Sequence, residues 1–414
     1  MVLVRVCDAI MGSGKSSAAI AYMNEHKDQK FVYITPYLDE AKRIRDGCPE
    51  LDFVEPSNKI GAYDYRKMTH TAALIKEGRN ITTTHQAFKR YTPETLDDIR
   101  RHGYTLIADE NVDTLEKFEY SPGDLRVLVE AGYVKADGDS YKRTNKVYTG
   151  NALREIYSLL ESREIIRTED EDMNAVFFWT LPRDLFLAFK DVYILTYLFE
   201  GQSLHHFLTI YGIPYTRIGI LRTEGGYRFT EGYGDTPEYV RTLRERIHIM
   251  DSDKLNDIGA ARTALSMNWF KARADMAEQL KNNIGNYYRH IWEDVPKERR
   301  LWGSFVSTYN QIRGKGYSNS FLPFNAKSTN AYRKCDHLVY AANVFMNVNE
   351  KKFYKEHGII VDEDEYSLSV MVQWIWRSAI RDGNDIWVYI PSKRMRELLI
   401  GWVNRLADKD RRNT

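Results

Sequence analysis

Hydrophobic and polar residues alternate in blocks over the first 110 residues of the chain. Short apolar runs at 2–6, 31–34 and 104–108 are typical of buried strands, and the stretch 40–44 has the spacing of a helix. A further short strand is expected at 80–85. Strands that alternate with helices predict a mostly parallel sheet covered by helices. We therefore expect an α/β fold.

The pattern changes twice further along the chain. Between about 115 and 175 the residues become polar and rich in turn formers, which indicates an insertion, and a strand pattern resumes at 192–196. A second region is expected from Gly201, where strand signals recur and a helical pattern occupies about 250–300. These changes predict two domains, residues 1–200 and 201–414.

Composition narrows the class of protein. The 414 residues are 43% hydrophobic and 28% charged, which is ordinary for a soluble globular protein. No apolar run approaches the roughly 20 residues that a membrane span needs, so we expect no membrane partner. Three widely spaced cysteines favour a reducing cytoplasm without disulfides. The net charge is only +1, so a nucleic-acid site would have to be a local groove.

Residues 7–17 read CDAIMGSGKSS and stand between an apolar strand and a helical pattern. Glycines let the backbone approach phosphate oxygens closely, and successive N–H groups with the helix N-terminus form an anion cradle. Lys15 would reach the terminal phosphates, and the Ser16 hydroxyl would hold Mg²⁺. The alternative is a Gly/Ser turn that precedes a lysine, and Ala9 does replace the first glycine of the general pattern. The candidate nucleotide-binding residues are Met11, Gly12, Ser13, Gly14, Lys15, Ser16 and Ser17.

Two carboxylates, Asp109 and Glu110, follow the apolar strand at 104–108. Ligands of doubly wound sheets bind at the carboxyl ends of the strands, where this pair lies. Asp109 would hold Mg²⁺, and Glu110 would orient and deprotonate the attacking water. The alternative is a solvated acidic pair at the start of a helix.

Residues 366–382 have helical spacing, and Gly383 suits a helix stop. Gln373, Arg377 and Arg381 follow one another four residues apart and would share one face. Such arginines suit an arginine finger, which brings positive charge to the γ-phosphate. The alternative is a surface helix whose arginines pair with local acids.

Eight segments, in order, resemble the motifs of a superfamily 2 helicase motor, particularly the short phage-type replicative helicases. They are AIMGSGKSS, ITPYLDEA, ITTTHQAF, IADENV, ILTYLFEG, GSFVSTYN, KSTNAYRKCDHLVY and QWIWRSAIR. The first, fourth and eighth are specific in combination. Trp376 departs from the family's Q-x-x-G-R pattern, and the second arginine lies four residues after the first instead of three. Thr196 lacks the usual Ser-Ala-Thr context.

The resemblance implies two RecA-like lobes with ATP and Mg²⁺ in the cleft, an insertion in lobe one and a helical insertion in lobe two. Lobe one would supply Glu110 to catalysis, and lobe two would supply Gln373, Arg377 and Arg381. The partner would be single-stranded or forked DNA, with RNA not excluded, and translocation from 3′ to 5′ is expected in phage replication or recombination. Replication proteins are further expected partners, in the host cytoplasm. The candidate nucleic-acid contacts are Thr35, Thr84, His85, Thr308, Ser328 and Thr329.

Two other functions remain open at this point. A packaging ATPase of the large-terminase type shares the phosphate loop and the acidic pair, but it would need a nuclease site, for which the acidic run 362–365 is the candidate. That run is more often a helix cap than a metal site. A nucleotide-gated module that recruits replication partners is the third reading.

Overall fold

The computed structural model describes residues 2–36, 38–57, 59–60, 63–64, 67–170, 172–324 and 331–411. The chain divides into two compact units. Unit 1 comprises Met1–Ile10, Gly14–Asp235 and Asn347–Val361, and unit 2 comprises Met11–Ser13, Thr236–Met346 and Asp362–Thr414.

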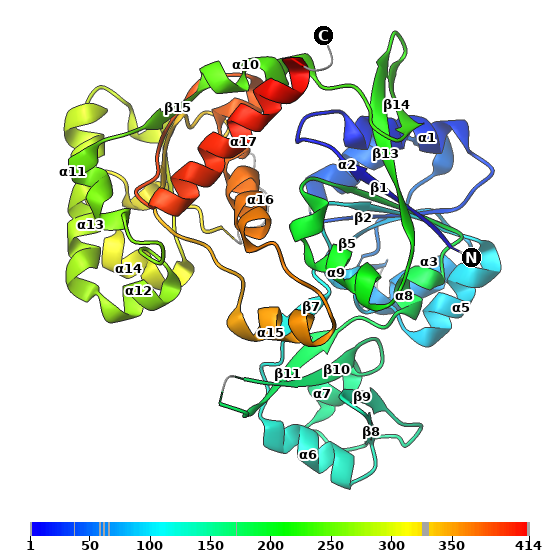
Figure 1. The fold of residues 1–414 in the computed structure, drawn as a ribbon. Helices are drawn as coiled ribbons and strands as arrows, with labels where there is room; N and C mark the ends of the chain where they lie inside the picture. The colour runs from blue at the N-terminus through cyan, green and yellow to red at the C-terminus, as the bar shows by residue number, and fades with distance from the viewer. Residues whose placement is uncertain are drawn as a thin grey trace. The chain divides into compact units, whose positions relative to one another are not determined.

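A seven-stranded sheet forms the centre of unit 1 (Figure 1). Its strand order is β14-β13-β1-β12-β6-β2-β5, and every neighbouring pair is parallel except β13 with β14. This arrangement confirms the mixed α/β class and the mostly parallel sheet. The strands are β1 (Leu3–Asp8), β2 (Phe31–Thr35), β5 (Ile81–Thr84), β6 (Thr105–Asp109), β12 (Asp191–Thr196), β13 (Tyr215–Thr223) and β14 (Gly226–Glu231).

Helices cover both faces of this sheet. Successive strand residues point to opposite faces, and in these strands the side chains on both faces are apolar and pack against helices. Val4 and Val6 of β1 belong to one hydrophobic cluster with α3, α5, α8 and α9. Cys7, the next residue, belongs to a second cluster with α1 and α2. The helices are α1 (Lys15–Glu25), α2 (Leu38–Gly47), α3 (Lys67–Lys76), α4 (His85–Phe88), α5 (Pro93–His102), α8 (Asp184–Leu187) and α9 (Ser203–Ile210), with a short ribbon of β3 (Lys59–Ile60) and β4 (Tyr63–Asp64).

An antiparallel sheet interrupts unit 1 between β6 and β12. Its order is β7-β11-β10-β9-β8, and it has its own core, which includes Leu128, Ile165 and Trp179. The sheet occupies the region in which the turn-rich sequence indicates an insertion. Its elements are β7 (Leu115–Lys117), α6 (Pro122–Glu130), β8 (Val134–Asp137), β9 (Ser140–Arg143), α7 (Arg154–Leu159), β10 (Glu164–Glu169) and β11 (Ala175–Thr180).

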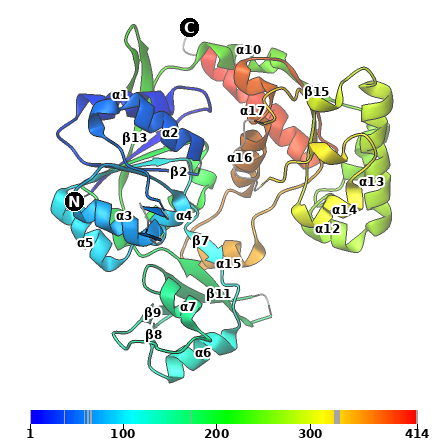
Figure 2. The same ribbon diagram turned by 180° about the vertical axis from the view of Figure 1, so that it is seen from behind.

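Helix α15 (Val348–Glu356) completes unit 1 from a distant part of the chain. Figures 1 and 2 both show it beside β7 and β11. Phe353 is 3% exposed and contacts the ring of Phe178, with a centroid distance of 6.2 Å. The buried Tyr354 lies 4.6 Å from the ring of His206 in α9. The helix therefore packs against both the inserted sheet and the central domain of unit 1.

Unit 2 is built on a four-stranded parallel sheet in the order β15-β18-β17-β16. Val339 and Tyr389 pack on one face with α12 and α13, and Tyr340 contacts Trp374 of α16 on the other. The elements are α10 (Glu238–Arg246), β15 (Ile247–Met250), α11 (Asp253–Asn256), α12 (Met267–Ala272), α13 (Ala274–Asn286), β16 (Arg300–Gly303), α14 (Tyr309–Ile312), β17 (His337–Tyr340), α16 (Glu363–Ile375), β18 (Ile386–Tyr389) and α17 (Lys393–Arg411).

Two predicted helices are shorter than the sequence pattern indicates. The helical pattern over about 250–300 is broken, since Arg273 has non-helical angles between α12 and α13. The stretch 366–382 ends its α-helix at Ile375, and Ser378 is extended. The Ser378 hydroxyl donates to the Ile375 carbonyl over 2.6 Å, so a side chain takes up a carbonyl at the end of the helix. A 3-10 turn follows at Ala379–Asp382.

Among the described residues, none of the helices combines the length and apolar character that crossing a bilayer requires.

Candidate nucleotide site

The phosphate loop joins the carboxyl end of β1 to α1. Gly12 and Gly14 have φ angles of 80° and 95°, which only glycine adopts without strain. Gly14 is the N-cap of α1 and carries no side-chain cap, so the first N–H groups of the helix are left for a ligand. This is the backbone geometry that the sequence motif predicts for an anion cradle.

Lys15 turns its ammonium group back over this loop. Its Nζ donates to the carbonyl oxygens of Ala9 over 2.5 Å and Ile10 over 3.1 Å. Burial lowers the pKa of Lys15 below its usual range, and the nearby charges of Asp109 and Glu110 oppose this effect. A bound phosphate would offer the ammonium group stronger acceptors than these two carbonyls.

Asp109 lies at the carboxyl end of β6 and is 9% exposed. Burial raises its pKa to about 7, and the neighbouring carboxylates of Glu40 and Glu110 add to the increase. Glu40 and Glu110 thus place two further negative charges near the buried Asp109, where Lys15 supplies one positive charge and Arg43 pairs with Glu40. The donor set of Asp109 and the Ser16 hydroxyl therefore fits a hard divalent ion such as Mg²⁺.

Glu110 follows Asp109 in a left-handed conformation, with φ at 67°. Its N–H donates to the Leu195 carbonyl of β12 over 2.9 Å, which fixes the backbone there, and its side chain is exposed. Left-handed backbone in a residue other than glycine is uncommon and clusters at functional sites. The charge of Glu110 still acts on both Asp109 and Lys15.

Two further residues near this site had no distinguishing signal in the sequence. Tyr33 lies within β2 and is fully buried beside Asp109 and Ser16, although none of these contacts has good hydrogen-bond geometry. Burial raises the pKa of Tyr33 well above its usual range. Arg43 of α2 donates to the Ser17 hydroxyl over 2.9 Å and pairs with Glu40. The pairing of β2 with β6 brings Tyr33 to Asp109, and the contact of α2 with the phosphate loop region brings Arg43 to Ser17.

The predicted nucleic-acid contacts of unit 1 are mostly engaged within the protein. His85 Nε2 donates to the backbone carbonyl of Asp109 over 2.8 Å, and burial lowers the pKa of His85 to about 4, so it is neutral. Thr84 caps α4, its hydroxyl accepting from the Ala87 N–H, and Thr35 is fully buried. Contact of these three residues with nucleic acid stays a prediction.

The predicted catalytic residues of unit 2 do not share one helix face. Gln373 is partly buried in α16, Arg377 lies in the turn after that helix, and Arg381 is exposed in the 3-10 turn. The prediction of a continuous helix over 366–382 was wrong for the reason given above. Because these residues belong to unit 2 and Glu110 belongs to unit 1, their meeting around one nucleotide stays a prediction.

The remaining residues predicted to contact nucleic acid lie in unit 2 or outside the described residues. Thr308 is 1% exposed and donates to the Phe305 carbonyl. Ser328 and Thr329 lie outside the described residues.

The acidic run 362–365 acts as a helix cap. The Asp362 carboxylate accepts from the N–H groups of Asp364 and Glu365, and the Asp364 carboxylate pairs with Arg394 over 2.6 Å. This confirms the helix-cap reading of the run.

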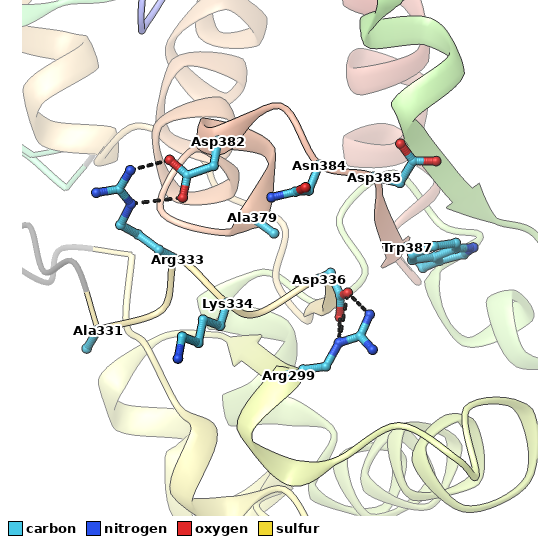
Figure 3. A pocket seen from close by; sticks show the side chains of 10 residues that line it. All are labelled: Arg299, Ala331, Arg333, Lys334, Asp336, Ala379, Asp382, Asn384, Asp385 and Trp387. Atoms are coloured by element: carbon cyan, nitrogen blue, oxygen red, sulfur yellow. Dashed lines mark hydrogen bonds and ion pairs between the residues drawn. The ribbon is translucent and has the colours of Figure 1, made fainter.

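A pocket of about 810 Å³ in unit 2 belongs to the packing of that unit (Figure 3). Arg299 pairs with Asp336, and Arg333 pairs with Asp382. The ring of Trp387 is stacked by His248 and by His337, each with centroids 4.9 Å apart. The pocket lies at the amino ends of β16, β17 and β18, whereas ligands of open α/β sheets bind at the carboxyl ends. The lining residues are Arg299, Ala331, Arg333, Lys334, Asp336, Ala379, Asp382, Asn384, Asp385 and Trp387.

The fold defines a mixed α/β protein with mostly parallel sheets, and comparison with known proteins supports this class. Residues 241–403 match the model of the YonV C-terminal Rossmann-like domain. The chain is 37% identical over 412 residues to the SPbeta prophage-derived uncharacterized protein YonV of Bacillus subtilis (strain 168), covering 97% of this chain and 98% of that protein. The chain therefore belongs to the YonV family.

Solved structures with partial similarity include an XPD helicase, which has a TM-score of 0.42 at 11% identity and covers 96% of this chain and 94% of that one. An apo XPD structure has a TM-score of 0.48 at 11% identity, covering 96% of this chain and 95% of that one. Xpd4 of S. tokodaii also has a TM-score of 0.48 at 11% identity, with coverage of 97% and 94%. TM-scores below 0.5 do not transfer a function from those proteins to this chain.

Proposed function

We propose that this protein is an ATP-driven nucleic-acid motor, a superfamily 2 DNA helicase or translocase that moves along single-stranded DNA. The observation that carries the proposal is the pairing of a glycine phosphate loop with the buried Asp109 at the carboxyl edge of one parallel sheet. That combination suits a triphosphate with a divalent ion. The ordered motif resemblance adds the nucleic-acid role.

In this proposal each candidate residue of the nucleotide site has a defined task. The N–H groups of the loop and Lys15 bind the β- and γ-phosphates. Ser16 and Asp109 would hold Mg²⁺, which neutralises developing charge on the phosphates. Glu110 positions the attacking water and accepts its proton on a carboxylate oxygen. Tyr33 excludes water from one side of Asp109.

Nucleic acid would be sensed through the backbone of the acidic pair. His85 links the start of α4 to the Asp109 carbonyl by one buried hydrogen bond, and Thr84 precedes it in the chain. A strand bound near Thr84 would therefore act on the position of Asp109. Gln373, Arg377 and Arg381 would contact the γ-phosphate from unit 2. Since the YonV relative is described as prophage-derived, we propose a role in prophage DNA replication or recombination.

The test is the ATPase rate with and without single-stranded DNA. DNA should stimulate the native protein, and Glu110→Gln should lower the rate by about 10²- to 10⁴-fold, the usual contribution of a general base. Glu130→Gln, an exposed acid at the end of α6, is the matched control and should keep the native rate. An active Glu110→Gln protein would refute the proposal.

Arg377→Ala tests the part played by unit 2. Loss of DNA-stimulated turnover with retained ATP binding supports an arginine finger. A native rate in this variant would remove unit 2 from catalysis.

A further inference from the structure

The ring of Tyr227 lies directly against the phosphate loop. Tyr227 is the second residue of β14, and β14 packs along α1. A methyl group placed on Gly14 would come within 2.4 Å of Tyr227 Cδ1 and 2.6 Å of Cε1. Only glycine at position 14 therefore permits both the left-handed turn and this approach of the ring.

Tyr227 differs from the next inward-facing residue of the same strand. Both residues are partly buried and pack against the hydrophobic cluster that includes α1. Phe229 stacks on Tyr193 with centroids 5.5 Å apart and also contacts Tyr22, whereas in the described part of the chain no ring pair or cation–π contact involves Tyr227. Its ring thus keeps surface available beside an anion cradle.

The order of strands tells which end of a nucleotide would lie near this ring. In the sheet, β13 and β14 lie on one side of β1, and β12 and β6 lie on the other. The γ-phosphate belongs near Asp109 and Glu110, which follow β6. The nucleoside must leave the loop in the opposite direction, toward β14 and Tyr227.

We propose that Tyr227 is the residue that binds the nucleobase, by stacking on its face. The inference rests on the proposed function, because it assumes that the loop binds a nucleoside triphosphate. Base–aromatic stacking tolerates different bases, since every base has a π-face. Tyr227 is then a positioning residue that orients the nucleoside while the loop holds the phosphates.

The experiment compares ATP with inorganic tripolyphosphate, which has the phosphates but no base. Binding of each with Mg²⁺ is measured by calorimetry for the native protein, Tyr227→Ala, Tyr227→Phe and Tyr227→Trp. Tyr227→Ala should weaken ATP binding by roughly 5- to 150-fold, the range of one stacked base, and should change tripolyphosphate binding less than about twofold. The Phe and Trp variants should bind ATP like the native protein. Tyr233→Ala removes a tyrosine that is 90% exposed after the same strand and is the matched control.

Two results overturn the inference. Equal weakening of ATP and tripolyphosphate in Tyr227→Ala would show that the ring only supports the loop, and unchanged ATP binding would show that it contacts no base. Failure of the proposed function has a different pattern, in which the native protein binds neither ligand or Lys15→Ala binds both normally. Circular dichroism of each variant verifies that it is folded.

Discussion

Ionisation of the Glu350 carboxyl group in α15 opposes the docking of this helix at neutral pH. Burial raises the pKa of Glu350 from 4.5 to about 7, and the negative charge of Asp113 adds to the increase. The folded state therefore holds a proton on Glu350 that the unfolded chain has released. The folded state becomes less stable as the pH rises from about 4.5 to 7, because ionising Glu350 costs more free energy in the folded protein than in the unfolded chain. Glu350→Gln removes this cost.

The size of the effect follows from the two pKa values. Their difference corresponds to about 3.4 kcal/mol, since each pKa unit is worth about 1.4 kcal/mol. Glu350 lies in the first turn of α15, where the helix dipole favours a negative charge by about 0.3–1 kcal/mol. We therefore expect Glu350→Gln to stabilise the docked helix by roughly 2–3 kcal/mol at pH 8, and by much less at pH 5.

Hydrogen exchange of the α15 amides is the direct assay, because it reports the free energy of local opening. The protection of Glu350→Gln relative to the native protein should grow between pH 5 and pH 8, after correction for intrinsic exchange rates. Glu94→Gln, at an exposed first-turn glutamate of α5, is the control and should leave α15 unchanged. A difference that is constant with pH, or a variant less protected at pH 8, would refute the reasoning.

Three further variants test the packing. Phe353→Ala should cost about 3–5 kcal/mol in urea unfolding, because it empties a buried ring site, and a loss below about 1 kcal/mol would contradict the docking of α15. Gly219→Ala would place a methyl group 1.9 Å from the backbone nitrogen of Gly234, so little soluble protein is expected, and a native melting temperature would disprove this contact. Arg394→Met removes a buried guanidinium that donates to the carbonyls of Val344 and Glu363 and should cost about 1–3 kcal/mol, whereas a neutral result would show that these hydrogen bonds are dispensable.

The sequence sufficed for the parts of the structure that depend on local pattern. The strands β1, β2, β6 and β12 are rich in apolar residues, and the phosphate loop has glycines at positions with positive φ. Asp109 and Glu110 follow a strand of the same sheet, as expected. These features can be recognised from residues that are close together in the sequence.

The errors concern long-range pairing and competition for backbone groups. Strands β13 and β14 follow Gly201, yet they join the sheet of unit 1, and a strand pattern does not reveal which sheet a strand extends. The helix over 366–382 ends early because the Ser378 hydroxyl takes the Ile375 carbonyl, which hydrophobic spacing does not register. In the sequence Tyr33 resembles any other buried strand residue, and only the pairing of β2 with β6 shows that it lies near Asp109.

The distant origin of α15 affects how the protein is made. The central sheet of unit 1 is formed by residues 3–231, but α15, the last helix of that unit, is synthesised only after Thr236–Met346. At roughly 5–20 residues per second this is a delay of about 5–20 s. During that time the side chains that later cover Phe353 and Tyr354, Phe178 and His206 among them, face solvent on the ribosome. Nascent unit 1 should therefore expose an apolar surface that a chaperone can recognise until Val348–Glu356 emerges from the ribosome.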